Sequence, residues 1–127
     1  LAGLPVSLNR NMLFDFIWVD DFSRFLHSIL DKLPLSTMSY NFCTGSPVSL
    51  LNLAQIINEL MSNSTEVIVK NSGMNPEYSG DPSMIFKEIG DFDFTSFESS
   101  INKLIKFYKE TLTAEDIKIF RGNAIGK

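Results

Sequence analysis

The sequence has few of the residues that build catalytic and metal sites, and each shortage excludes a class of function. Cys43 is the one cysteine and His27 the one histidine, so neither an internal disulfide nor a zinc site of clustered Cys and His can form. The two also lie too far apart in sequence to indicate a nucleophile paired with its base. The glycines do not form Gly-x-Gly-x-x-Gly or Gly-x-x-x-x-Gly-Lys. We therefore expect no metal centre and no phosphate-cradling loop.

The chain also lacks positive charge and long apolar runs. Eleven Lys and Arg against fifteen Asp and Glu give a net charge of −4, the wrong sign for binding nucleic acid through its phosphates. No apolar run approaches the ~18–20 residues of a membrane span, and no secretory signal opens the sequence. These features predict a cytoplasmic protein that binds neither nucleic acid nor membrane.

What is present is the composition of one folded domain. The chain has 127 residues, 44% of them hydrophobic, and includes eleven Phe. Residues 13–19 are aromatic and β-branched and predict a buried strand. Asp20-Asp21 could serve acid–base chemistry or a metal, but a carboxylate before an apolar stripe is what a helix N-cap requires. We therefore expect a helix capped by Asp20 or Asp21 and stopped by Pro34, whose apolar stripe is Phe22, Phe25, Leu26, Ile29, Leu30 and Leu33.

The middle of the chain repeats this alternation. Residues 40–43 predict a second strand, 44–47 a turn, and 66–69 a third strand. Between them we expect a helix capped by Ser49 that ends at a polar break over residues 62–64. Its predicted apolar face is Leu50, Leu53, Ala54, Ile57, Leu60 and Met61. Residues 70–80 are rich in Asn, Gly and Pro and form the expected functional loop.

The C-terminal third predicts helices only. Asp81-Pro82 is typical of an N-cap followed by proline at the first helical position, and the short helix should run to about Glu88 and end at Gly90. Residues 95–98 match a capping box, and 113–121 predict a terminal helix, with the last six residues frayed. The long helix after the capping box should be apolar at Phe97, Ile101, Leu104, Ile105, Tyr108 and Leu112.

Strands alternating with helices indicate an α/β fold with a small sheet of short strands and about five helices. A sheet of that size is often completed by another part of a larger protein. Three rings, Phe14, Phe16 and Trp18, share one side of the first predicted strand, either as core packing or as a platform beside a ligand. Residues 44–46 are interpreted as a turn rather than an anion site, and 91–94 as exposed acids alternating with buried rings.

Four segments, in order, resemble the C-terminal portion of the extended short-chain dehydrogenase/reductases, the NAD-dependent nucleotide-sugar epimerases and dehydratases. Residues 14–22 (Phe-Asp-Phe-Ile-Trp-Val-Asp-Asp-Phe) are similar to the family's Arg-Asp-Phe/Tyr-Ile-x-Val-x-Asp-Leu, and residues 40–50 to its Tyr-Asn-x-Gly-x-Gly strand and turn. Residues 80–90 look like Asp-x-Ser/Thr followed by Leu-Gly, and residues 94–108 like the closing helix. The resemblance covers roughly residues 5–112.

The resemblance implies the C-terminal substrate domain of a Rossmann-type enzyme whose other half binds NAD or NADP. That half carries the family's Gly-x-x-Gly-x-x-Gly loop and its Tyr-x-x-x-Lys pair, and no lysine follows Tyr40, Tyr78 or Tyr108 at that spacing. Together with the start at Leu1-Ala2 rather than Met, this implies a fragment that is inactive alone and binds no cofactor itself. Its divisions are residues 1–112, the substrate-binding domain, and residues 113–127, a terminal helix and tail.

The implied substrate is a nucleotide sugar, and the implied partner is the chain's own N-terminal Rossmann domain. Phe14 stands where many relatives hold the diphosphate with arginine, and no arginine precedes Gly80, so the usual diphosphate contacts are in doubt. The substrate-binding candidates are Phe14, Phe16 and Tyr78, with no catalytic, cofactor or metal residue. The full-length enzyme is expected to be a homodimer and this chain a monomer.

Two other classes of protein stay open. The chain can be a non-catalytic binding or structural module that kept the shape of the family after losing its clamps. It can also be a self-sufficient small α/β domain unrelated to the family, in which case it should unfold cooperatively without a partner.

Overall fold

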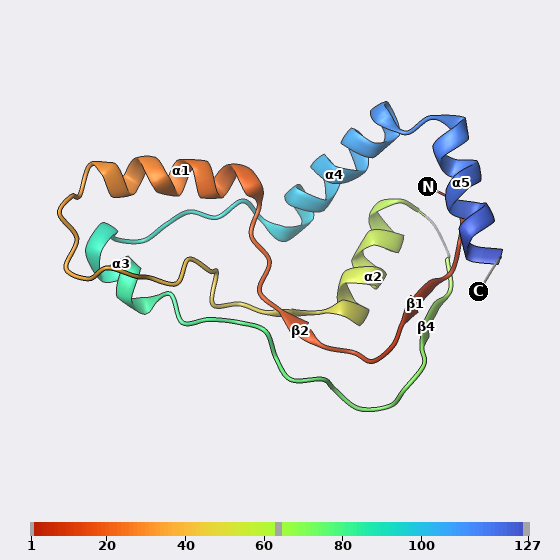
Figure 1. The fold of residues 1–127 in the computed structure, drawn as a ribbon, viewed down its shortest axis with the longest axis horizontal. Helices are drawn as coiled ribbons and strands as arrows, with labels where there is room; N and C mark the ends of the chain where they lie inside the picture. The colour runs from red at the N-terminus through yellow and green to blue at the C-terminus, as the bar shows by residue number, and fades with distance from the viewer. Residues whose placement is uncertain (1, 63–64, 126–127) are drawn as a thin grey trace.

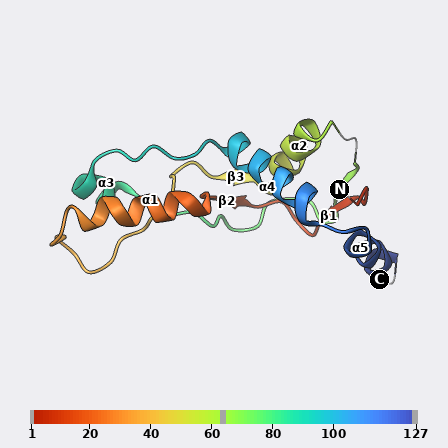
Figure 2. The same ribbon diagram turned by 90° about the horizontal axis from the view of Figure 1, so that it is seen from above.

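The computed structural model describes residues 2–62 and 65–125 as an elongated arrangement of short strands and five helices (Figure 1). Helix α1 (Val19–Leu30) and helix α3 (Ser83–Ile89) lie at one end. Helix α2 (Leu50–Leu60) and helix α4 (Phe97–Thr111) occupy the middle. Helix α5 (Ala114–Ile125) lies at the other end beside the N-terminal strand, as the view from above also shows (Figure 2).

The strands form two separate pairs instead of one small sheet. Strand β1 (Val6–Leu8) lies parallel to β4 (Val67–Val69), with Val6 opposite Val67. Strand β2 (Leu13–Phe14) lies antiparallel to β3 (Val48–Ser49). The third predicted strand is confirmed as β4. Strand β1 was not predicted, because three residues are too few to show a period.

The predicted strand over 13–19 is largely wrong, and so is the predicted cap of the helix after it. Only β2 is strand, and α1 already begins at Val19, with Trp18 at the N-cap position and no side-chain cap. Asp20 instead accepts a hydrogen bond from the Trp18 indole nitrogen at 2.8 Å, and Asp21 is fully buried against Thr95. The carboxylate of Asp21 therefore bonds Thr95, which is distant in sequence, and does not cap α1 as the local pattern predicted.

The predicted strand over 40–43 is also wrong. This segment has no ladder partner among the described residues, although part of it is buried. The ring of Phe42 joins an aromatic cluster and Cys43 is buried. A Cβ on Gly80 would lie 3.1 Å from the Cys43 sulfur, so a side chain there would require the sulfur or the loop to shift by a few tenths of an ångström. The apolar residues of this segment therefore pack against the rest of the chain and do not pair in a sheet with any part of it that the structure describes.

The other helix boundaries follow the sequence with small shifts. Ser49 caps α2 as predicted, by accepting from the Asn52 amide at 3.1 Å, and residues 63–64 of the predicted break lie outside the described part. Helix α3 starts one residue late, because Pro82 occupies the cap position while Asp81 accepts from the Ser83 amide at 2.9 Å. Gly90, at φ +84°, ends α3 as predicted.

Two helix ends near the C-terminus differ from prediction. Ser96, not Thr95, caps α4 and accepts from the Ser99 amide at 3.2 Å, because Thr95 bonds Asp21. Helix α5 continues to Ile125, past the predicted end at 121, so residues 122–125 are helical and not frayed. Residues 126–127 lie outside the described part.

The core is a cluster of phenylalanine rings at the α1 end. Phe25 and Phe42 stack with ring centroids 3.8 Å apart, and Phe92 meets both rings edge-on. Phe94 stacks on Phe42 at 5.4 Å, and Ile85 of α3 is fully buried. The predicted alternation over 91–94 is confirmed, since both acids are exposed and both rings face inward. This cluster ties α1 to helix α3 and to the segments before α2 and α4.

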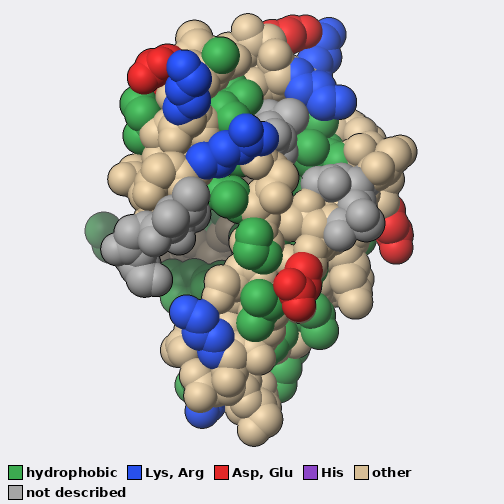
Figure 3. Space-filling view, turned by 90° about the vertical axis from the view of Figure 1, so that its right-hand side faces the viewer, with side chains coloured by type: hydrophobic (Ala, Val, Ile, Leu, Met, Phe, Trp, Pro, Cys, Tyr) green, Lys and Arg blue, Asp and Glu red, His purple; other side chains and the backbone are tan. Residues whose placement is uncertain are grey.

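Much apolar surface stays uncovered. The solvent-accessible surface is 8857 Å², whereas a compact 14.3 kDa monomer exposes roughly 6,800 Å². Of the stripe predicted for α1 only Phe25 is buried, and Phe22, Leu26 and Leu30 are 46%, 44% and 64% exposed. Apolar side chains also reach the surface between charged ones at the α5 end (Figure 3). Among the helices described, none is long and apolar enough to cross a membrane.

Candidate functional site

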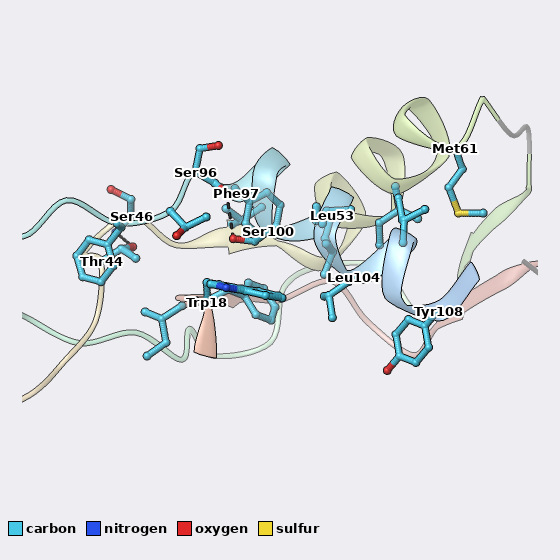
Figure 4. A pocket seen from close by; sticks show the side chains of 18 of the residues that line it. Trp18, Thr44, Ser46, Leu53, Met61, Ser96, Phe97, Ser100, Leu104 and Tyr108 are labelled. Atoms are coloured by element: carbon cyan, nitrogen blue, oxygen red, sulfur yellow. Dashed lines mark hydrogen bonds between the residues drawn. The ribbon is translucent and has the colours of Figure 1, made fainter. Parts of the chain in front are cut away.

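A large apolar cavity lies between α2 and α4. Its volume is about 850 Å³. In Figure 4 the side chains of Leu53 and Leu104 lie in the middle of it, with Trp18 and Phe97 toward one end and Met61 and Tyr108 toward the other. The lining includes backbone and hydroxyl groups at Thr44, Ser46, Ser96 and Ser100, and none of the residues that line it is charged. The apolar faces predicted for the two helices therefore meet across an open space.

The structure brings the three predicted site residues into one row. The Phe14 ring lies 5.7 Å from that of Phe16 on one side and 5.7 Å from that of Tyr78 on the other. Phe16 lines the cavity and its ring lies 6.0 Å from Phe97 of α4. Tyr78 is 71% exposed. We call Phe14, Phe16 and Tyr78 the aromatic row; it leads from the cavity to the surface.

Backbone hydrogen bonds join residues 11–15, which include β2, to the loop over 70–80. The Asp15 amide donates to the Tyr78 carbonyl at 3.1 Å, and the Tyr78 amide donates to the Leu13 carbonyl at 2.9 Å. Asn75 donates in the same way to Asn11 at 2.8 Å. The two segments that the sequence singled out as functional therefore form one edge of the molecule.

Asp15 fixes the turn at the mouth of the cavity. Its carboxylate accepts from the Thr44 amide at 3.0 Å, from the Thr44 hydroxyl at 2.7 Å and from the Gly45 amide at 2.7 Å. These amides are thus occupied within the chain, which agrees with the interpretation of residues 44–46 as a turn. Sequence reasoning missed this role, although the position of Asp15 opposite the rings of its strand was a signal for it.

Asp21 fixes the start of α4 to α1. It accepts from the Thr95 amide at 2.9 Å, the Thr95 hydroxyl at 2.7 Å and the Arg24 guanidinium at 2.7 Å. Burial acts to raise the pKa of Asp21, but the hydrogen bonds from Arg24 and Thr95 outweigh it and hold the pKa below its usual value. Thr95 lines the cavity, so Asp21 positions one of its walls.

Cationic side chains lie at the rim of the cavity. The Lys103 ammonium is 5.2 Å from the centre of the Trp18 ring, and Trp18, Lys103 and Lys106 also line a second hollow of about 310 Å³. Arg24 is engaged by Asp21 and by the Asp93 carbonyl at 2.7 Å. The positive charge nearest the cavity is therefore on lysines that face solvent.

The cysteine and the histidine show no sign of catalysis. Burial raises the pKa of the Cys43 thiol, and the nearby Asp15 carboxylate raises it further, so the thiol stays protonated at neutral pH. His27 makes a ring-to-carbonyl hydrogen bond with Ser23 at 2.9 Å on the exposed side of α1. Within residues 2–62 and 65–125 no three Cys, His, Asp or Glu side chains gather as metal ligands would.

Comparison with known proteins shows a likeness of fold to solved structures. No family model matches the chain, and no curated protein matches it either. The fold is that of part of an α/β enzyme of the Rossmann type. Among solved structures the chain is similar to the enzyme WbmH of Bordetella bronchiseptica, solved in complex with NAD⁺, with a TM-score of 0.68 and 20% sequence identity.

The likeness covers 86% of this chain and 37% of the WbmH chain. At that identity it establishes the fold, and at the level of the fold it confirms the resemblance drawn from the sequence. The predicted α/β class is confirmed as well, with five helices among the described residues.

Proposed function

We propose that the chain is the substrate-binding part of an NAD(P)-dependent nucleotide-sugar epimerase or dehydratase. The observation that carries the proposal is the likeness to 37% of the chain of an NAD⁺-bound enzyme, a share that leaves the larger part of such an enzyme without a counterpart here. In this proposal that larger part supplies the cofactor and the tyrosine and lysine of the family's proton transfer. The chain alone is then inactive.

The residues described do not fit a cofactor site of their own. The cavity lining carries no charged side chain to pair with a pyrophosphate, and the Thr44 and Gly45 amides at its mouth already donate to Asp15. We therefore assign NAD or NADP to the N-terminal Rossmann domain.

The uncovered apolar surface supports that domain as the partner. Val19, Phe22, Leu26 and Leu30 form an exposed apolar face along α1, spaced as one side of a helix. Exposed apolar side chains that share one face mark an interaction surface more often than scattered ones do. In this proposal the nucleotide-binding domain of the same enzyme covers this face of α1.

The aromatic row is proposed to hold the nucleotide sugar. Its rings are open to solvent at Tyr78 and continue into the cavity at Phe16, so a planar base or the apolar face of a sugar can stack along it. The row carries no cation, and Asp15 beside it is engaged with Thr44. The diphosphate charge is therefore balanced by groups of the other domain in this proposal.

Truncating the row is expected to weaken nucleotide-sugar binding. Phe14→Ala and Tyr78→Ala each remove one stacking ring, and loss of a stacked aromatic is worth about 1–3 kcal/mol, or roughly fivefold in Kd at the lower end. The measurement is calorimetric titration of the chain with a panel of nucleotide sugars.

Phe107→Ala is the matched control for this titration. Phe107 is also an exposed ring, 55% accessible, but it belongs to α4 outside the aromatic row. Its removal should leave Kd unchanged. Equal effects of all three substitutions, or none, would contradict the assignment of the row.

A second candidate function is a non-catalytic binding module of the same fold. The uncharged lining of the cavity favours it, because such a lining suits an apolar ligand or partner as well as it suits a domain interface. The sequence of the complete gene product separates the two. Gly-x-x-Gly-x-x-Gly and Tyr-x-x-x-Lys upstream of this segment support the enzyme, and their absence supports the module.

A further inference from the structure

Helix α5 lies over one end of the cavity. Its Phe120 is part of the lining, together with Met61 of α2 and with Tyr108 and Leu112 at the end of α4. The neighbouring Arg121 donates from Nε to the Ala2 carbonyl at 3.0 Å, which fixes this helix to the N-terminal segment. Residues 112–125 follow the segments on which the resemblance to the reductase family depends.

The attachment of α5 is light. Most of its side chains are exposed, and Phe120 itself is 53% accessible. Helix α4 ends at Thr111, and Leu112 then takes an extended conformation at φ −73° and ψ 128°. Thr113 opens the next helix by exchanging hydrogen bonds with Asp116, its hydroxyl donating to the carboxylate at 2.7 Å. The chain therefore has two separately capped helices joined by a short extended link.

We propose that α5 is a displaceable strap, and that Phe120 is the side chain with which it closes its end of the cavity. A lightly packed helix with its own cap can move as a unit, because its hydrogen bonds are internal and need not break. A molecule that fills the cavity contacts Phe120, and one that extends past this end has to displace it. The strap thus limits how far an occupant can extend beyond the cavity.

The test uses the fluorescence of Trp18, the chain's one tryptophan, which is part of the cavity lining. An anilinonaphthalene sulfonate dye bound near Trp18 accepts its excitation energy, both in the cavity and in the second hollow that Trp18 also lines. The cavity is therefore measured by the difference in sensitised emission between a Phe120 variant and a control variant on the same helix. Phe120→Ala in the full chain is expected to raise this emission severalfold at equal dye concentration. Phe120→Leu, which keeps an apolar plug, should raise it less.

Ile119→Ala is the matched control. Ile119 is an apolar neighbour on the same helix with the same 53% exposure, but it does not line the cavity. Its substitution should leave the sensitised emission at the wild-type level while circular dichroism confirms an unchanged helix content in every variant. Equal emission from Phe120→Ala and Ile119→Ala, or no rise in either, would overturn the proposal. So would a Phe120→Leu signal as high as that of Phe120→Ala.

Discussion

Asp21→Ala is expected to lower the free energy of unfolding by about 3 kcal/mol, since it removes a buried carboxylate with several partners. The substitution leaves the Thr95 amide and hydroxyl without their acceptor and leaves Arg24 without its ion pair. It also loosens α4 from α1 at the wall of the cavity. Chemical denaturation followed by circular dichroism measures the change.

Asp20→Ala is the control for this substitution. Asp20 is the preceding carboxylate, exposed at the surface, and its hydrogen bond to the Trp18 indole is also exposed. Its loss should change stability by no more than about 0.5 kcal/mol. Equal effects of the two alanines would show that the burial of Asp21 is not what matters, and would contradict the role assigned to it.

The same carboxylate gives stability a pH dependence. Although burial acts to raise it, hydrogen bonds from Arg24 and Thr95 hold the pKa of folded Asp21 below the 3.8 of an unperturbed carboxyl. Its contribution is therefore complete above pH 3.8 and disappears as the pH falls through the lower, folded value. The difference in stability between the wild type and Asp21→Ala should be constant near neutral pH and shrink at strongly acidic pH.

Phe25→Ala is expected to be at least as damaging as Asp21→Ala, at about 3–5 kcal/mol. Phe25 is 4% exposed, stacks on Phe42 at 3.8 Å and meets Phe92 edge-on. Removing its ring empties the middle of the cluster that joins α1 to the rest of the chain. The unfolding midpoint in urea is the readout.

Phe22→Ala on the same helix isolates the effect of burial. Phe22 is 46% exposed and its ring lies 6.0 Å from that of Phe42. Its truncation should destabilise the chain by about 1 kcal/mol or less. If Phe22→Ala destabilised the chain as much as Phe25→Ala, the ring cluster would not be the core.

Local signals in the sequence predicted the parts of the fold that depend on neighbouring residues. Ser49 before an apolar stripe, Gly90 after a short one and the alternation over 91–94 each gave the right element. Distant partners explain the failures. Thr95 bonds Asp21 across 74 positions, and no local pattern could reveal that the carboxylate is a buried tether instead of a cap.

The site shows the same division. The sequence placed Phe14 and Phe16 on one side of a predicted strand and Tyr78 in the loop over 70–80. Only Phe14 lies in β2, and the structure adds the backbone pairing that brings the three rings together. The apolar faces of α2 and α4 were predicted from their periodicity. A periodic apolar stripe predicts that one face of a helix is covered, but it does not predict which element covers it. The cavity between α2 and α4 could therefore not be predicted from the sequence.

The proposed function is tested most directly by titrating the purified chain with nucleotide sugars and, separately, with NAD(H) and NADP(H) in a calorimeter. The account predicts heat of binding with at least one nucleotide sugar and none with either nicotinamide cofactor. The enzyme that contains this segment should bind both kinds of molecule. Cofactor binding by the chain alone, or the lack of any nucleotide-sugar binding by both the chain and the complete enzyme, would contradict it.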